Sequence, residues 1–517
     1  MEKNISIIIF LCFFLSITFV NAQQSLTASS AQGTATSSTT ANLWNTVAST
    51  DLILTAGTKV LVEATIEIEV TGGNSNINTQ FRLTDGATDS QTINRYVATK
   101  TYTDKGIAAI SFIFDYGAGF TGTKTFSLEQ AKTTTGASKF FTTKAVITAI
   151  EIASSNVILP NGQGTAAISS TISTTDYEGA ATVNMITLEK PADIYIVSTF
   201  STSTPNASAT GAWSLGESTN NITYTEIPNS QITRSIIAAD DNGIGAATIV
   251  SLIKNKSAGN YYFRLAHKVN TGTNITTTGA TISVVVLRGT IATGDNIFPS
   301  YSDSPASATT SSNIYSDINT APIIAPTNGF TDNKFFMHAS YNMTASIANV
   351  VYATYKFGSS AGTITPFEIQ RYVLNGTTGS GGLIGIVSGI NQETPFNTSF
   401  QHKNSGATGT LTSSNVNTIG FFLNSDPFST LSVEEDILNT NISIFPNPAK
   451  EQFYINNNVT EGKTSFKFYT VTGQLVHTIN MMPKTNTKLD VKGWSSGIYI
   501  MKATNNGVNI AKKLIIE

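Results

Sequence analysis

One five-residue segment occurs three times in this chain, and the repetition limits the choice of fold more than any other feature. Its copies are Ile93-Asn94-Arg95-Tyr96-Val97, Ile232-Thr233-Arg234-Ser235-Ile236 and Ile369-Gln370-Arg371-Tyr372-Val373. The arginines are 139 and 137 residues apart, and eleven residues after each stands a glycine (Gly106, Gly245 and Gly382) that opens an eight-residue apolar run. Because solenoid repeats span only about 20 to 45 residues, each copy is predicted to be an independent domain.

The periodicity inside each copy is that of β-strands. Apolar side chains occupy every even position from Val60 to Val70, and three of the odd positions between them are glutamates. Such alternation indicates antiparallel strands with one buried and one solvent-facing side. The chain also contains 78 Thr and 53 Ser, and β-branched Thr is common in strands. We therefore predict an all-β fold with three tandem antiparallel β-sandwiches of jelly-roll type, each of roughly eight strands.

The closing segments of the copies resemble those of a known domain type. In the second copy, residues Tyr262 to Lys268 lead through a turn rich in Thr and Gly to a last segment, Thr281 to Leu287. This layout resembles the jelly-roll modules of C1q and tumour necrosis factor. The resemblance implies a jelly roll with a recognition role and, because domains of that superfamily are often trimeric, a homo-oligomer.

The charge of the chain excludes two classes of partner. Lys and Arg number 30 against 33 Asp and Glu, which gives a net charge of −3, and only 12% of residues are charged. Nucleic acids and anionic membrane surfaces are bound through concentrated Lys and Arg, so neither partner is expected. The small supply of acids and bases also argues against catalysis.

The first 22 residues have the composition of a secretory signal peptide. Lys3 provides a positive start, Ile5 to Val20 is apolar, and cleavage is expected after Ala22. Cys12, the single cysteine, lies inside this segment, so the mature chain is expected to contain no disulfide and no thiolate metal site. The remaining chain has no apolar stretch long enough for a membrane span.

The last 76 residues carry four motifs of a known export signal. In order, the motifs are Phe445-Pro446-Asn447-Pro448, the hairpin Thr472-Gly473-Gln474-Leu475-Val476, the block from Leu489-Asp490 to Gly497-Ile498-Tyr499, and the ending Lys512-Lys513-Leu514. The segment resembles the C-terminal sorting domain of the type IX secretion system of Bacteroidetes. The resemblance implies a small β-sandwich, handling by that secretion machinery, and delivery to the cell surface or the extracellular space. Its residues Pro446, Asn447, Pro448, Gly473, Gly497, Lys512 and Lys513 are the predicted sorting-signal motif.

These patterns divide the chain into seven parts. They are a signal peptide (1–22), a linker (23–40), sandwich module 1 (41–153), module 2 (160–290), module 3 (303–424), a second linker (425–441) and the sorting domain (442–517).

The repeated arginines are the sharpest candidate for a ligand-binding site. Arg95, Arg234 and Arg371 share strand parity with two aliphatic neighbours, so each points to the apolar side of its strand. One interpretation is an arginine whose methylenes cover the edge of the core and whose guanidinium forms hydrogen bonds with loop carbonyls or with a carboxylate. The other is one ligand contact per module, which would form a trivalent array. The first interpretation is favoured.

Other candidate chemistry has weaker support. The four histidines, His267, His338, His402 and His477, lack the close spacing of a zinc site, and no metal is expected. Calcium is retained as an alternative at oxygen-rich loops (Asp85 with Asp89, Asp240-Asp241-Asn242 and Asp332-Asn333), although none follows a known calcium pattern. Gly493-Trp494-Ser495-Ser496-Gly497 matches the nucleophile-elbow pattern, but a strand rather than a helix is expected after it. Aromatic candidates for sugar stacking are Trp44, Trp213, Tyr355 and the pair Tyr261-Tyr262.

Together these features predict an exported, non-enzymatic protein of the cell surface or extracellular space. Its three modules would act as an adhesin or as an array that binds a glycan or a protein. Two alternatives remain. A secreted polysaccharide hydrolase would require two carboxylates converging in one cleft, and a structural filament or coat subunit would require self-assembly.

Overall fold

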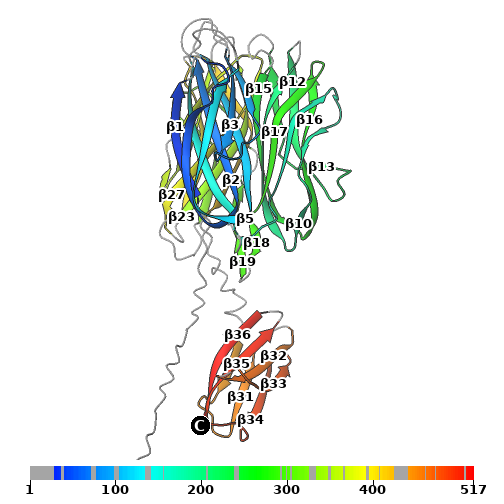
Figure 1. The fold of residues 1–517 in the computed structure, drawn as a ribbon, viewed down its shortest axis with the longest axis vertical. Coiled ribbons are helices and arrows are strands. Elements are labelled where there is room, and N and C mark those ends of the chain that lie inside the picture. Colours follow the sequence, from blue (N-terminus) through cyan, green and yellow to red (C-terminus); the bar gives the residue numbers. More distant parts are fainter. Residues whose placement is uncertain are drawn as a thin grey trace, which may run out of the picture. The chain divides into compact units, whose positions relative to one another are not determined.

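A computed structural model describes most of the chain as β-strands. It covers residues 28–36, 40–70, 77–97, 104–133, 141–154, 157–204, 208–237, 244–291, 294–297, 300–302, 306–324, 333–346, 351–364, 367–391, 395–406, 408–423, 441–459, 462–471, 473–505 and 508–517. The chain forms two compact units, residues 1–427 (the body) and 428–517. Within the described ranges no helix has the length and apolar character that crossing a bilayer requires. The predicted all-β fold is confirmed (Figure 1).

Module 1 of the body is one continuous sheet of order β1-β6-β2-β5-β3-β4. Its strands are β1 (Ala28–Thr36), β2 (Asn45–Val70), β3 (Ile77–Thr84), β4 (Ile93–Val97), β5 (Asp104–Lys132) and β6 (Phe141–Ser154). Strands β2 and β5 are long enough to run through both layers of the sandwich. The two strands are antiparallel, so the first part of β2 pairs with the end of β5 and the last part of β2 with the beginning of β5. The register shifts between these two parts, at Leu54 to Lys59.

Modules 2 and 3 divide the same arrangement between two separate sheets. In module 2 these are β15-β11-β17-β8 and β10-β16-β12-β13, with β14 beside β12 and β9 beside β16. In module 3 they are β20-β29-β23-β27-β25, with β21 beside β29, and β22-β28-β24-β26. Strands β19, β18 and β7 form a small separate sheet in this order, and the described strands show no pairing between it and the other sheets.

The strands of these two modules have the following bounds. Module 2 and the small sheet contain β7 (Val157–Ile158), β8 (Gly162–Thr171), β9 (Glu178–Thr182), β10 (Ile186–Leu188), β11 (Ala192–Ser203), β12 (Ala209–Ser218), β13 (Thr225–Glu226), β14 (Ile232–Ile236), β15 (Ile244–Lys256), β16 (Gly259–Thr271), β17 (Ile275–Val286), β18 (Arg288–Ile291) and β19 (Gly294–Ile297). Module 3 contains β20 (Ser300–Ser302), β21 (Ala306–Thr310), β22 (Ser316–Ile324), β23 (Asn333–Ser346), β24 (Val351–Ser359), β25 (Thr363–Ile364), β26 (Ile369–Val373), β27 (Thr378–Ile390), β28 (Pro395–Asn404) and β29 (Thr410–Phe422).

The strand pairings give the three modules a common register. In module 1, Glu63 on β2 pairs with Ser111 on β5 and with Thr148 on β6. The corresponding central strands are β11, where Val197 pairs with Val250 and Ser283, and β23, where His338 pairs with Ile384 and Ile419. We call the sheet around this central strand the inner sheet of each module. Positions in one module can therefore be compared with positions in the other two.

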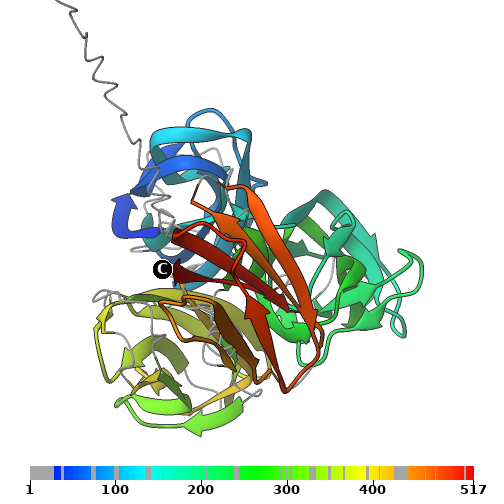
Figure 2. The same cartoon turned by 90° about the horizontal axis from the view of Figure 1, so that it is seen from below.

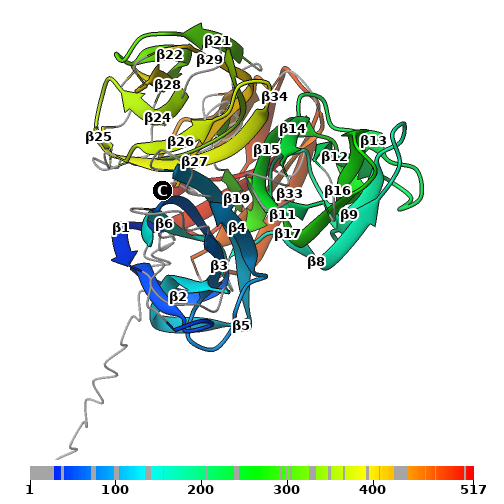
Figure 3. The ribbon, with the colours of Figure 1, turned by 90° about the horizontal axis from the view of Figure 1, so that it is seen from above.

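The inner sheets meet in a shared core. Each module has its own apolar cluster, and a further cluster is built from all three modules, including Leu61 of module 1, Tyr195 of module 2 and Phe336 of module 3. Figures 2 and 3 show the three modules around a common centre. Side chains that alternate with those of a module's own core are therefore buried as well, because they face the neighbouring modules.

The structure corrects two predicted boundaries and leaves others untested. Module 3 begins before its predicted start at 303, because β20 (Ser300–Ser302) pairs with β29. Residues 28–36, predicted to belong to a linker, form β1, which pairs along its whole length with β6 as part of module 1. The alternating Ser, Thr and Ala of this segment fit an edge strand, and the prediction underrated them because they are small. The signal peptide with Ala22 lies outside the described residues, as does nearly all of the predicted linker 425–441.

The C-terminal unit is a small sandwich of two sheets, β30-β31-β34 and β33-β32-β35-β36. Its strands are β30 (Ile442–Phe445), β31 (Gln452–Asn457), β32 (Thr464–Thr470), β33 (Leu475–Met481), β34 (Thr485–Asp490), β35 (Gly497–Asn505) and β36 (Val508–Ile516). One apolar core that includes Phe453, Phe466 and Met501 lies between the sheets.

Candidate functional site

The three repeated arginines are buried inside their own modules. Arg95, Arg234 and Arg371 lie on β4, β14 and β26, with 3%, 0% and 6% of their surface exposed. Arg95 donates to the carbonyl of Tyr96, and Nη1 of Arg371 donates to the carbonyl of Ser380 at 3.0 Å. Such burial leaves little guanidinium surface for an external ligand, so it argues against the trivalent array and favours the structural interpretation.

A glycine on the strand that follows next in the chain makes room for each arginine. A Cβ placed on Gly106 would lie 3.1 Å from Nε of Arg95, and one on Gly245 would lie 2.0 Å from Nε of Arg234. In module 3 this place belongs to Gly379, whose Cβ would lie 3.0 Å from Cζ of Arg371. The predicted equivalence of Gly382 with Gly106 and Gly245 is therefore wrong. The connection after β26 is shorter by three residues, and the alignment without gaps missed this.

The residue before each arginine connects its module to the next one. The backbone N–H of Asn94 in module 1 donates to Ser201 Oγ of module 2 at 2.5 Å. The N–H of Thr233 in module 2 donates to Asn342 Oδ1 of module 3 at 3.2 Å, and the N–H of Gln370 in module 3 donates to Glu67 Oε2 of module 1 at 2.5 Å. The donors thus lead from module 1 to module 2, from module 2 to module 3, and from module 3 back to module 1.

A second set of three hydrogen bonds repeats this cycle deeper in the body. The N–H of Ser111 donates to Thr199 Oγ1 at 3.1 Å, that of Val250 to Ser340 Oγ at 3.2 Å, and that of Ile384 to Thr65 Oγ1 at 3.1 Å. Donors and acceptors occupy equivalent register positions. The modules therefore form a closed ring of head-to-tail interfaces within one chain, a geometry otherwise familiar from cyclic oligomers.

Three polar side chains, one from each module, meet in the middle of the ring. The hydroxyl of Tyr195 donates to Glu63 Oε1 at 3.0 Å, and Nδ1 of His338 lies 2.8 Å from that hydroxyl and 3.0 Å from Glu63 Oε2. All three side chains are almost fully buried. Burial, together with the Glu63 charge, raises the pKa of Tyr195 well above its usual range. The cluster therefore links the three modules through contacts between buried polar side chains.

The seam between modules 3 and 1 differs from the other two. In module 2, β17 carries an extra residue beside β11, and Gly279 at this bulge has a φ of 56°. Gly279 lies against Thr92 of module 1, so that a Cβ on this glycine would be 2.0 Å from the Thr92 carbonyl oxygen. In module 3, β29 has the equivalent bulge, and Asn415 (φ 48°) donates to the carbonyl of Gln231 at 3.2 Å.

Strand β6 of module 1 pairs with β2 without such a bulge, so Thr65, Ile66 and Glu67 have consecutive partners. Here the long side chain of Lys144 spans the distance instead and donates to the carbonyl of Glu368 at 3.2 Å. Glu368 stands three residues before its arginine, as do Thr92 and Gln231. The carbonyl three residues before each arginine is thus approached by the backbone of Gly279 at the first seam, by the Asn415 side chain at the second and by the Lys144 side chain at the third.

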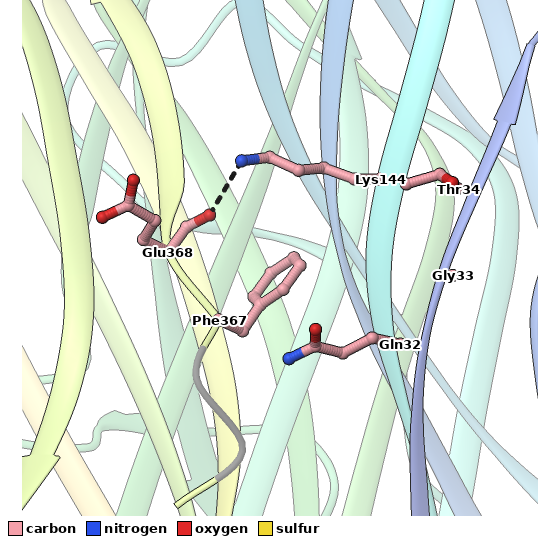
Figure 4. A pocket seen from close by; sticks show the side chains of 6 residues that line it. All are labelled: Gln32, Gly33, Thr34, Lys144, Phe367 and Glu368. Carbon is pink, nitrogen blue, oxygen red and sulfur yellow. Dashed lines mark hydrogen bonds between the residues drawn. The ribbon is translucent and has the colours of Figure 1, made fainter.

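A groove of about 380 Å³ lies at this third seam (Figure 4). We call it the seam groove. It is lined by Gln32, Gly33, Thr34, Lys144, Phe367 and Glu368. In Figure 4 the ring of Phe367 and the amide of Gln32 point into the space below the Lys144 side chain, whereas the Glu368 carboxylate points away.

The charges around the seam groove are matched. Lys144 Nζ lies 3.2 Å from Glu67 Oε1, and Lys105 Nζ lies 3.5 Å from the same oxygen. Burial raises the pKa of Glu67, although both lysines oppose this shift. The hydroxyl of Tyr315 donates to Glu368 Oε2 at 2.5 Å, and this bond lowers the pKa of Glu368 with help from Lys403 at 3.6 Å.

The predicted sorting motifs come together at one end of the C-terminal unit. Asn447 Nδ2 donates to the carbonyl of Lys513 at 2.7 Å, and the N–H of Ile515 donates to Asn447 Oδ1 at 2.8 Å. The peptide bonds before Pro446 and Pro448 are cis. Gly473 and Gly497 both have positive φ, and Lys512 and Lys513 lie on β36. Thr472 lies outside the described residues.

Residues 443–517 match the family model of the secretion system C-terminal sorting domain. The chain carries a type IX sorting domain. It is therefore a type IX secretion cargo, exported to the cell surface or the extracellular space. No curated protein matches the sequence.

Solved structures similar to this cargo protein are distant. The tandem CBM22-1-CBM22-2 domain of Paenibacillus barcinonensis Xyn10C is 12% identical over 50% of this chain and 93% of its own, with a TM-score of 0.15. PNGF-II is 10% identical over 51% and 65% (TM-score 0.21), and latent PorU of Porphyromonas gingivalis is 9% identical over 69% and 34% (TM-score 0.13). These scores are too low to carry an argument about the body, and the C1q-type resemblance stays a hypothesis.

The aromatic candidates of the cargo body divide into core and surface residues. Trp213 and Tyr355 are fully buried, and Tyr261 nearly so. Trp44 is half-buried just before β2, with the Arg82 guanidinium 4.4 Å from its ring centre. Sequence reasoning missed the two equivalent residues, which also directly precede strands. They are Tyr177, under Lys268 at 4.6 Å, and Tyr315, under Lys356 at 4.1 Å and Lys403 at 4.2 Å. The sequence repeats a His-Lys pair, His267-Lys268 and His402-Lys403, and its lysines cover the rings of Tyr177 and Tyr315, so this repeat was the available signal.

The histidines of the cargo body are structural in their surroundings. Nδ1 of His267 lies 2.7 Å from Thr277 Oγ1, and Nδ1 of His402 lies 2.8 Å from Ser413 Oγ, both in module cores. Burial lowers the pKa of each to about 4. The equivalent residue in module 1 is Gln130, also buried.

Of the calcium candidates, Asp85, Asp89 and Asn333 lie within the described residues, whereas Asp240, Asp241, Asn242 and Asp332 lie outside them. Asp85 Oδ1 accepts the N–H groups of Ala87 and Thr88 and so closes a turn, while Asp89 pairs with Arg82. Within the described part of the chain no group of three His, Cys, Asp or Glu side chains could hold a metal ion. In the Gly-x-Ser-x-Gly match, Trp494 packs on Tyr499 at 5.0 Å and strand β35 follows, as expected for a chance match.

Proposed function

We propose that this type IX cargo is a non-enzymatic, adhesin-like recognition protein of the cell surface or extracellular space, and that its ligands are glycans. The observation that carries the proposal is the closed ring. Its repeated arginines and core histidines are used for packing inside single modules, and the cluster of Glu63, Tyr195 and His338 holds the three modules together. The body then presents a rigid, weakly charged surface to the outside.

The low charge of this surface suits a glycan better than a nucleic acid or an anionic membrane. Neutral sugars are held by aromatic faces and by amide or hydroxyl groups, and half-buried Trp44, Tyr177 and Tyr315 together with the seam groove provide such groups. The three modules act as one body, because their equivalent faces are turned toward each other rather than outward.

A glycan array with the purified, full-length mature protein tests this proposal. We expect retention of a subset of glycans, and no release of reducing ends when the same glycans are incubated in solution. Release of reducing ends would favour the hydrolase. Absence of retention, combined with ordered self-assembly seen by light scattering and electron microscopy, would favour the filament or coat subunit.

A further inference from the structure

We propose that the seam groove between modules 3 and 1 is a binding site for a neutral saccharide chain. This inference rests on the proposed function and assigns it to one place in the ring. It is argued from the broken symmetry of the seams, from the chemistry of the lining, and from the balance of charges around it.

The lining of the seam groove is specific to one interface, because the symmetry of the ring is broken there. At the seam of modules 1 and 2, the backbone of Gly279 closes onto Thr92, and at the seam of modules 2 and 3, Asn415 reaches Gln231 while Asn417 Nδ2 donates to the carbonyl of Asn229. Module 1 has no bulge at this place in β6, and the Lys144 side chain crosses the distance alone. The residues that fill this place at the other two seams, Gly279 and Asn415, have no counterpart in β6, and the seam groove lies at this point.

The lining has the groups that recognise a pyranose ring. Phe367 packs against the apolar clusters of the body with part of its ring and turns the rest toward the seam groove, so its position is fixed before a ligand arrives. An aromatic ring offers a face for the C–H groups of a sugar. The lining also includes the Gln32 amide and the Thr34 hydroxyl, and groups of these two kinds form hydrogen bonds with sugar hydroxyls.

The charge balance favours a neutral ligand over an anionic one. The ammonium of Lys144 is already 3.2 Å from the buried carboxylate of Glu67, and it donates to the Glu368 carbonyl. The carboxylate of Glu368 is held by Tyr315 and Lys403, away from the lining face. A carboxylated or sulfated sugar would find no unmatched cation here. A volume of about 380 Å³ is at the small end of the range for ligand sites, which suits one or two sugar units.

Affinity electrophoresis of the full-length mature protein tests the site. The probes are gels containing soluble xylan, mannan, mixed-linkage glucan or starch, beside gels containing alginate or chondroitin sulfate. We expect retardation by at least one neutral polysaccharide and none by the acidic ones. Phe367→Ala should weaken the binding about tenfold or more, which corresponds to about 1.4 kcal/mol.

Two further variants keep the test decisive. Thr34→Trp fills the seam groove from an exposed position of β1 without removing packed atoms, so it should also abolish the retardation even if Phe367→Ala unfolds. Ile222→Ala, which removes an apolar side chain of module 2 that is 82% exposed, should retain it. If Phe367→Ala and Thr34→Trp bind like the unaltered protein, the seam groove is not the site, while the proposed function stands. If the unaltered protein is retarded by none of the neutral polysaccharides and retains nothing on the glycan array, the proposed function itself fails.

Discussion

Module 1 and its two neighbours share one strand plan, yet they differ at three equivalent places. Module 1 has two long strands where modules 2 and 3 have separate ones, Gln130 where they have His267 and His402, and no bulge where they have Gly279 and Asn415. The difference teaches that the repeat preserves the interfaces through backbone register and hydroxyl acceptors. Core side chains and the filling of each seam were free to change. Three predictions test this comparison.

The largest expected effect concerns the core histidines. Both are neutral in the folded protein with a pKa of about 4, whereas an unfolded histidine binds a proton below about 6.5. Stability is therefore complete above pH 6.5 and falls as the pH approaches 4, by about 3 kcal/mol for each histidine. Module 1 shows that glutamine is accommodated at this position. The variant H267Q/H402Q should thus lose much less stability between pH 7 and pH 4 than the unaltered protein, measured by denaturant unfolding at each pH.

The carboxylates of the body also titrate in this range, but they are the same in both proteins and cancel in the difference. An equally steep loss of stability in the double variant would mean that the histidines are not held neutral in the fold.

The next effect concerns the seam of modules 1 and 2. Gly279→Ala places a Cβ 2.0 Å from the carbonyl oxygen of Thr92 at a positive φ, so we expect a loss of about 3 kcal/mol in the free energy of unfolding. The matched control is Gly376→Ala. It has a similar φ of 74° but open space around it, and strain alone should cost about 1 kcal/mol. Equal losses for the two variants would show that the seam yields to the extra methyl group.

The smallest effect should be the same at all three seams. Thr65→Val, Thr199→Val and Ser340→Ala each remove one hydroxyl that accepts a buried backbone N–H from the adjacent module. Each variant should lose about 1 to 3 kcal/mol, since a buried donor remains without its partner. Calorimetry of the three variants compares the seams directly. A loss at the seam of modules 3 and 1 much below the other two would show that the ring is weakly closed there.

The sequence predicted the strands better than the way in which they assemble. Alternation at residues 60–70 correctly placed β2 in a sandwich, and the arginine repeat marked equivalent strands. The same alternation misled in one respect, because Glu63, Thr65 and Glu67 read as solvent-facing although all three are buried against other modules. A period of two separates the faces of a strand but does not say what covers each face. Contacts between residues such as Gln370 and Glu67, 303 positions apart, have no local signal.

The candidate site was less predictable than the fold for the same reason. Arg95, Arg234 and Arg371 stood out by repetition, and repetition here marks what each module needs for its own packing. Phe367 and Lys144 have no counterpart of their kind in the other copies, so a search for shared residues passes over them. The seam groove arises where the copies disagree, and only the assembled ring brings its two sides together.

The closed ring within one chain has a genetic consequence. In a trimer of identical subunits, any substitution at an interface appears three times, so a change that opens one seam opens all of them. Here the three interfaces are encoded by separate stretches of sequence. Two can be kept tight by Gly279 and Asn415 while the third relies on the long side chain of Lys144. Because the three copies are joined in one polypeptide, two interfaces can hold the assembly together while the third evolves the seam groove independently.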